Sequence, residues 1–265
     1  MLALIIGVPL FTVSLLRSQL LAGTAKKIQN ERLHGQQLET EKDISGVKAI
    51  KVLGDKTLDA RDIRLKVASG TKDRYKFEKM STKDSLEVSW VGDTLVFRYF
   101  VNDSIATSEG GFVNHSPIYI TVHLKAPVPL YASRASITYL LGERDPADYA
   151  ALPGKAALVN QQIYLENKAL LSMGQQVNNS KNARKKTDTL PVNFIYRMQI
   201  SAENSAVYFD GQQHFGYLNL EMRRGGGLYL NTPFTADKIE GSLSGSTYLQ
   251  GDYGDIKSLL PILHQ

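Results

Sequence analysis

Apolar and polar residues alternate along most of the chain after residue 46, as expected for β-strands that bury one face. The alternation is regular from Ile118 to Leu124, where every second residue is apolar. Helical periodicity is nearly absent after residue 45. The segment Val91 to Thr94, with Gly92-Asp93 at its centre, separates two such runs and predicts a hairpin turn. The pattern therefore predicts an all-β domain over 46–265.

Two interleaved series of apolar strands recur in the C-terminal third of the chain with one spacing. Two interleaved series with one period indicate a solenoid in which each coil contributes two strands. Ile118 and Tyr139 have the same spacing, which suggests that the period begins there. The members of each series are 21 residues apart: Val207, Leu228 and Leu249 in the first, and Leu218, Ile239 and Leu260 in the second.

The favoured fold is a right-handed parallel β-helix with about 20 residues per coil, since parallel β crossovers are generally right-handed. A β-sandwich or jelly roll is the alternative, because short strands separated by turns fit that class too. Residues 174–191 lack periodicity and contain Arg184-Lys185-Lys186, so we expect an exposed insertion there.

The N-terminal segment is hydrophobic. Residues 1–23 predict a signal or anchor helix, which would attach the protein to the membrane through residues 2–22. A cleaved signal peptide and a buried soluble helix are the alternatives. Arg17, Lys26 and Lys27 follow the apolar run, which by the positive-inside tendency argues against an extracytoplasmic domain. Residues 24–45 are polar and charge-mixed, and predict a tether or a helical stalk.

Composition excludes several classes of chemistry. The chain has 265 residues and no cysteine, so disulfides, thiolate nucleophiles and Cys-ligated metals are excluded. Its 43% of hydrophobic residues is enough for a sizeable core. A formal charge of +5 permits contact with acidic lipid or polysaccharide without indicating nucleic acid.

Three short motifs resemble the auto-transporter adhesin head domain, a bacterial β-helical family. They are Val47-x-x-Ile50-x-Val52, Val91-Gly92-Asp93-Thr94-Leu95 and Ile239-Glu240-Gly241-Ser242-Leu243-Ser244-Gly245-Ser246. The resemblance spans residues 46–260 loosely, and implies a β-helical fold and a cell-envelope location. It supplies no catalytic residues, and the chain departs from the family in lacking a lipoprotein Cys and in its basic 174–191 insertion.

Outward-facing tyrosines are the strongest candidates for a binding surface. Tyr208 and Tyr229 are 21 residues apart, and Tyr248 follows after 19 more. In register they would form an aromatic ladder, which binds sugars or partner surfaces but also stabilises stacked strands. Arg223 and Arg224, before three glycines, form either an anion site or a solvent-facing corner.

No arrangement of residues predicts catalysis, a cofactor or a metal. The five histidines have no metal-binding spacing, and there is no Gly-x-Ser-x-Gly or Walker motif. Glu240, Asp252 and Asp255 could meet on one edge, but no acidic cluster recurs at the coil spacing. We therefore expect a non-enzymatic cell-envelope protein that presents a β-solenoid surface for adhesion or scaffolding, with a polysaccharide or protein partner. The alternatives are a carbohydrate-active β-helix enzyme and a membrane-linked regulatory or sensing domain.

Overall fold

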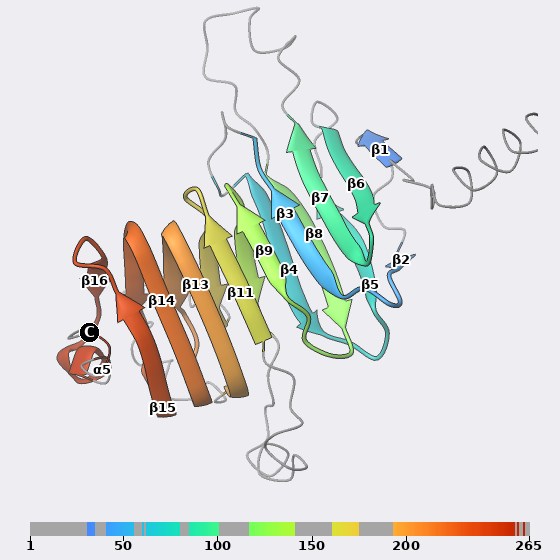
Figure 1. Cartoon of the computed structure of the whole chain (residues 1–265). Helices are drawn as coiled ribbons and strands as arrows, with labels where there is room; N and C mark the ends of the chain where they lie inside the picture. The colour runs from blue at the N-terminus through green and yellow to red at the C-terminus, as the bar shows by residue number, and fades with distance from the viewer. Residues whose placement is uncertain are drawn as a thin grey trace, which may run out of the picture.

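The computed structural model is all-β (Figure 1). It describes residues 31–34, 41–55, 60, 62–79, 85–100, 117–140, 161–174, 193–257, 259 and 262. Within these residues, 16 strands form one curled sheet, and the only helix with defined bounds is the short α5 (Tyr253–Lys257). The all-β prediction is therefore confirmed.

The long strands of the curled sheet bend, and the two halves of each pair with different strands. The first half of β13 (Asn193–Phe209) pairs with β11, and its second half pairs with β12. The same holds for β14 (Gln213–Leu230), which pairs with β15 and then β16. The sheet thus has two limbs, which share β13 and β14.

The first limb also contains β1 (Glu31–His34), β6 (Ser85–Val91), β7 (Thr94–Phe100), β3 (Ala49–Leu53), β9 (Leu130–Ser133), β11 (Gln161–Glu166) and β15 (Phe234–Leu243). The second limb also contains β2 (Lys42–Asp43), β5 (Arg74–Lys79), β8 (Ile118–Leu124), β4 (Ile63–Ser69), β10 (Ser136–Tyr139), β12 (Leu170–Met173) and β16 (Tyr248–Gln250). Both series follow their order in the sheet.

Most neighbouring strands are parallel. Among the described pairs, the antiparallel ones are β1–β6, β6–β7, β2–β5 and β5–β8, which lie toward the two ends of the sheet. A β-sandwich or jelly roll is built from antiparallel strands, so the predominant parallel pairing does not match that alternative. The predicted turn is confirmed: β6 and β7 form a hairpin in which Val91 pairs with Thr94, and Gly92 has a φ of 62°.

Residues with positive φ mark the bend between the limbs. Arg134 lies between β9 and β10, Asn167 and Lys168 lie between β11 and β12, and Asn204 lies within β13. In β14 the bend contains Gly226, with a φ of 107°. A Cβ there would lie 2.1 Å from the carbonyl oxygen of Ser205, so only glycine fits without rearrangement.

The core lies between the limbs and is built from every second side chain of the strands. Residues from both limbs belong to one hydrophobic cluster, for example Leu130 on β9 and Ile137 on β10, each 0% exposed. After α5, Leu259 and Ile262 are also buried in this cluster. Together with Ile256 of α5, which packs against the cluster, these two residues cover part of the core beyond the last strand.

Chain order and spatial order differ at the N-terminal end of the domain. The first long strands, β3 and β4, lie inside the sheet. β7 and β8, later in the chain, pair with one side of them. β9 and β10 pair with the other side.

The 21-residue spacing holds only in the C-terminal part. Val207 pairs with Leu228, and Leu228 with Leu249, as predicted. Leu218 also pairs with Ile239, but the second series does not continue as a strand: Ile256 lies in α5, and Leu260 is outside the described residues. The predicted pairing of Ile118 with Tyr139 is wrong too, because β4 lies between β8 and β10.

The predicted N-terminal helix (1–23) and the 174–191 insertion lie outside the described residues, apart from Gly174 at the end of the described β12 segment. Within the predicted 24–45 tether, residues 31–34 and 42–43 form the end strands β1 and β2. None of the described helices has the length and apolar character needed to cross a bilayer.

Candidate functional site

The outer face of the second limb carries two rows of side chains that cross the strands in register. We call them the tyrosine row and the arginine row. The tyrosine row is Lys76, Thr121, Lys66, Thr138, Ser172, Tyr208, Tyr229 and Gln250. The arginine row is Tyr119, Arg64, Ser136, Leu170, Ala206, Gly227 and Tyr248. Toward one end, the tyrosine row contains lysines and the arginine row contains Arg64. Toward the other end, both rows contain tyrosine.

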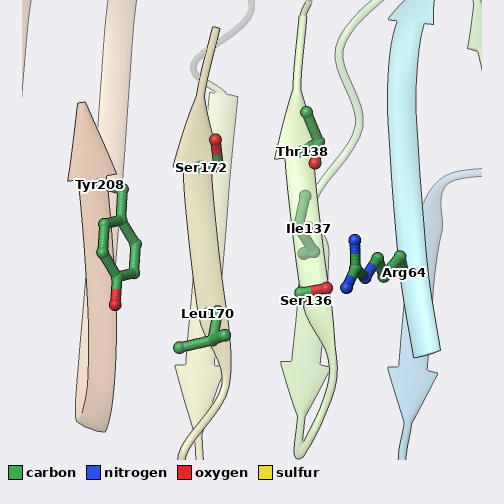
Figure 2. A pocket seen from close by; sticks show the side chains of 7 residues that line it. All are labelled: Arg64, Ser136, Ile137, Thr138, Leu170, Ser172 and Tyr208. Atoms are coloured by element: carbon green, nitrogen blue, oxygen red, sulfur yellow. The ribbon is translucent and has the colours of Figure 1, made fainter. Parts of the chain in front are cut away.

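A pocket lies where the middle parts of the two rows meet (Figure 2). Its volume is about 320 Å³, and it is lined by Arg64, Ser136, Ile137, Thr138, Leu170, Ser172 and Tyr208. Figure 2 shows Arg64 and Tyr208 on opposite sides, with the side chains of β10 and β12 between them. The hollow arises because two adjacent strands carry mostly small residues between two large ones.

The tyrosine end of the face is a stack of rings. Tyr208 and Tyr229 are stacked with centroids 4.4 Å apart and 6° between their planes, which confirms their predicted register. Tyr248 lies opposite Gly227, and its ring is tilted by 49° against Tyr229 at 5.7 Å. This end of the stack is open to solvent, since Tyr248 is 57% exposed. The three predicted tyrosines are therefore brought together, the third less regularly.

The ring of Tyr229 packs over Gly227 on the same strand. A Cβ at Gly227 would lie 2.4 Å from Cε2 of Tyr229, so the ring lies directly over this glycine. The absence of a side chain lets the ring cover the strand, as aromatic residues do over glycines in sheets.

Cationic side chains characterise the other end of the face. The guanidinium carbon of Arg64 lies 5.2 Å from the centroid of the Tyr119 ring on the neighbouring strand, within cation–π range. Lys66 is exposed on the same strand, and Lys76 is half-buried two strands away. Three cationic side chains therefore lie at this end of the face.

A buried carboxylate organises the pocket floor at β12. Asp210, 6% exposed, accepts a hydrogen bond from Ser172 Oγ at 2.5 Å and another from Asn231 Nδ2 at 2.7 Å. These contacts connect the ends of three neighbouring strands. They also commit the Ser172 hydroxyl proton to Asp210, which leaves the oxygen lone pairs for a ligand.

Arg223 and Arg224 lie at the bend of β14 and do not join the pocket-lining residues. Arg223 Nη2 is 2.7 Å from Glu221 Oε2, and Arg224 Nη1 is 2.7 Å from Glu203 Oε1. Both arginines are largely exposed, and their charges are balanced by these glutamates. The arrangement matches the solvent-facing corner more closely than an anion site.

Acidic residues do not converge in the pocket. On the first limb, the Tyr217 hydroxyl donates to Glu240 at 2.5 Å, and Lys238 lies 2.6 Å from the same carboxylate. The hydrogen bond to Glu240 raises the pKa of Tyr217, and the hydrogen bond from Lys238 lowers the pKa of Glu240. Asp252 and Asp255 lie after β16, where burial and then the charge of Asp252 raise the pKa of Asp255.

No group of three or more His, Cys, Asp and Glu side chains within the described ranges could hold a metal ion. The carboxylates that the sequence places near one another are thus divided between the first limb and the C-terminal segment. This arrangement offers the chemistry of ion pairing and capping rather than a converging acid and base.

Sequence reasoning missed Arg64, Ser136, Thr138, Leu170 and Ser172. They come from three strands that are separated by long connections, so no fixed spacing relates them to Tyr208. Their alternation places each of them on the polar side of its strand. The alternation predicts on which side of its strand each residue lies, but not which strands are adjacent in the sheet.

No model of a known protein family and no curated protein sequence matches the chain. Among solved structures, a crystal structure of a proposed cell-adhesion protein from Clostridium sporogenes aligns with 83% of this chain and 98% of its own chain at 9% identity. The TM-score of that alignment is 0.28, which is too low to carry an argument about fold or function. The resemblance to the adhesin head domain family therefore stays a prediction from its motifs.

Proposed function

We propose that this chain is a non-enzymatic cell-envelope protein that presents the outer face of its second limb for adhesion or scaffolding. The observation that carries the proposal is the stack of Tyr208 and Tyr229, continuous with the pocket on one side and exposed Tyr248 on the other. Tyr208 and Tyr229 are half-buried, and aromatic rings held in a fixed arrangement at a surface bind with little loss of conformational entropy.

The finer architecture in this proposal is a right-handed parallel β-helix with about 20 residues per coil. The parallel register supports it: Met198 pairs with Leu218, 20 positions later, and Leu218 pairs with Ile239, 21 positions later. Each turn of chain would give one strand to each limb. Such a solenoid presents a repetitive, rigid surface.

The proposed location is the cell envelope, with a membrane tether at residues 2–22 and the β domain outside the cytoplasm. The hydrophobic N-terminal sequence and the family resemblance support it. A cleaved protein, periplasmic or secreted, is the alternative. Membrane fractionation with mass spectrometry of the N-terminus, and protease accessibility in spheroplasts, separates the two. A protected cytoplasmic product contradicts both.

A carbohydrate-active enzyme is less favoured because none of the 7 residues that line the pocket is a carboxylate. Glycoside hydrolysis generally needs two carboxyl groups flanking the scissile bond. Incubation of envelope polysaccharide with the protein should leave the chain length unchanged by size-exclusion chromatography. A progressive shortening would establish an enzyme instead.

Adhesion is tested with beads that carry the full chain, mixed with envelope polysaccharide and intact cells of the producing organism. The variant is Tyr208→Ser with Tyr229→Ser, and the matched control is Tyr131→Ser with Tyr164→Ser. The control pair is also stacked, at 4.7 Å and 9°, but on the first limb. We expect the second-limb variant alone to lose adhesion. Equal adhesion of all three proteins would overturn the role of this face.

A further inference from the structure

The pocket joins a cationic wall, a hydroxyl-lined floor and an aromatic wall, and this combination defines a ligand. We propose that the pocket binds a uronic acid unit of an acidic polysaccharide, with the carboxylate at Arg64 and the sugar ring against Tyr208. The inference rests on the proposed function of the outer face as a binding surface. It adds the class of ligand and the residues that recognise it.

The dimensions fit one sugar unit of a longer chain. The volume of about 320 Å³ lies at the lower end of small-molecule pockets, which run from about 300 to 1,000 Å³. The tyrosine row crosses eight strands from Lys76 to Gln250. With about 4.8 Å between strands, it extends for roughly 34 Å. The surface on both sides of the pocket is therefore long enough for a linear polymer.

Arg64 selects an anion. Its planar guanidinium can donate two parallel hydrogen bonds to a carboxylate, and the Tyr119 ring 5.2 Å away supports it from the neighbouring strand. Lys66 is exposed two residues later on the same strand and adds positive charge. The pocket lining includes no acidic residue, and the buried carboxylate of Asp210 is bound to Ser172 on β12, which β10 separates from the strand of Arg64.

The serines of the floor present acceptors to the ligand. The Ser172 hydroxyl donates to Asp210, and the Ser136 hydroxyl donates to the carbonyl oxygen of Ile63 at 3.3 Å. With their protons committed, both oxygens can accept hydrogen bonds from ligand hydroxyl groups. A sugar acid supplies both partners, because its hydroxyls donate to serines and its carboxylate accepts from arginine.

Tyr208 provides the aromatic wall. Stacking on Tyr229 fixes its ring, so little rotamer entropy is lost when a ligand packs against it. The C–H faces of sugar rings are apolar and pack against aromatic rings of this kind. This contact would serve neutral sugars as well, which is why Arg64 is the residue that decides between the two classes.

The test measures binding of trigalacturonate and of neutral maltotriose to the full chain by isothermal titration calorimetry. The variants are Arg64→Gln, Arg64→Lys and Tyr208→Ala. Arg223→Gln is the control for charge, because Arg223 is an exposed arginine outside the pocket, and Tyr131→Ala is the control for a stacked tyrosine. Circular dichroism verifies that each variant is folded.

We expect trigalacturonate to bind and maltotriose to bind at least about tenfold more weakly. Arg64→Gln should weaken trigalacturonate binding about tenfold or more, with Arg64→Lys intermediate because lysine keeps the charge but not the bidentate geometry. Tyr208→Ala should weaken it by a similar factor, and the two controls by less than about twofold.

Three results would overturn the inference. Equal loss in Arg64→Gln and Arg223→Gln would show non-specific charge attraction. Unchanged affinity in both Arg64→Gln and Tyr208→Ala would place the ligand elsewhere. Binding of neither saccharide, or tighter binding of maltotriose, would exclude a uronic acid site; the outer-face proposal would then still stand if the tyrosine variant lost adhesion on beads.

Discussion

Tyr208 and Tyr229 are stacked on the outer face, with ring centroids 4.4 Å apart, while their neighbours Val207 and Leu228 pair inside the core. One strand register therefore sets both contacts. A shift by one residue would exchange the two faces and lose the core and the stack together. The outer ladder is fixed by the same pairing that buries the apolar residues.

The stack should contribute a measurable coupling energy. Tyr208→Ala, Tyr229→Ala and the double variant form a double-mutant cycle, and urea unfolding should give a coupling of about 0.5–1.5 kcal/mol, the range for aromatic pairs. Tyr208 with Tyr131, on different limbs, is the control pair and should couple by less than about 0.5 kcal/mol. Equal coupling in both cycles would contradict a specific stack.

Gly226 should resist substitution. In Gly226→Ala, the new Cβ would lie 2.1 Å from Ser205 O at a φ of 107°, so the bend must move. We expect the free energy of unfolding to fall by about 2 kcal/mol or more. The control is Gly245→Ala, where no heavy atom lies within 4 Å and the change should stay within about 0.5 kcal/mol. Similar values for both would show that the bend is not constrained.

Asp210 should matter more than an exposed aspartate. Asp210→Ala removes the acceptor of Ser172 and of Asn231, and unfolding in urea should show a loss of about 2 kcal/mol. Asp237, whose side chain is 61% exposed and 3.4 Å from His214, is the comparison. Asp237→Ala should cost at most about 0.5 kcal/mol. An unchanged free energy of unfolding in Asp210→Ala would mean that water replaces the carboxylate as the acceptor.

Tyr139 should make the fold sensitive to alkali. Its side chain is 1% exposed, and burial raises the pKa of the phenol far above its usual range. The hydroxyl donates to Gln161 Oε1 at 3.2 Å. Because the pKa of Tyr139 is raised in the folded state, its neutral phenol contributes to the free energy of unfolding. That contribution is fully present below the unfolded-state pKa near 10 and is lost as the pH rises further.

Urea unfolding of the wild type and Tyr139→Phe between about pH 8 and pH 11 tests this dependence. The other tyrosines are common to both proteins, so the difference between the two slopes belongs to Tyr139. It should approach about 1.4 kcal/mol per pH unit above pH 10, for one proton. Parallel slopes would show that Tyr139 ionises in the folded protein.

The local part of the fold was predictable from sequence. The alternation from Ile118 to Leu124 gave a strand because each strand buries one face, and Gly92-Asp93 gave the hairpin because the turn needs a positive φ. The 21-residue spacing also paired Tyr208 with Tyr229 correctly. In that region the connections between strands are short, so a nearly constant number of residues separates the paired positions of adjacent strands.

The long-range part could not be predicted in this way. β3 pairs with β9, and Ile50 lies opposite Leu130, 80 positions later in the chain. Periodicity carries no information about such a pairing, since β4 to β8 intervene in sequence and none of them lies between β3 and β9 in the sheet. The same limit applies to the pocket, whose walls, Arg64 and Tyr208, come from distant parts of the chain.

The position of β3 and β4 inside the sheet affects how the protein is made. These strands leave the ribosome before both of their neighbours on either side, β7 with β8 and β9 with β10. Until those later segments have been synthesised, the sheet partners of both edges of β3 and β4 are missing. Two strands that are synthesised early therefore lie in the interior of the finished sheet, with strands synthesised later on both sides of each.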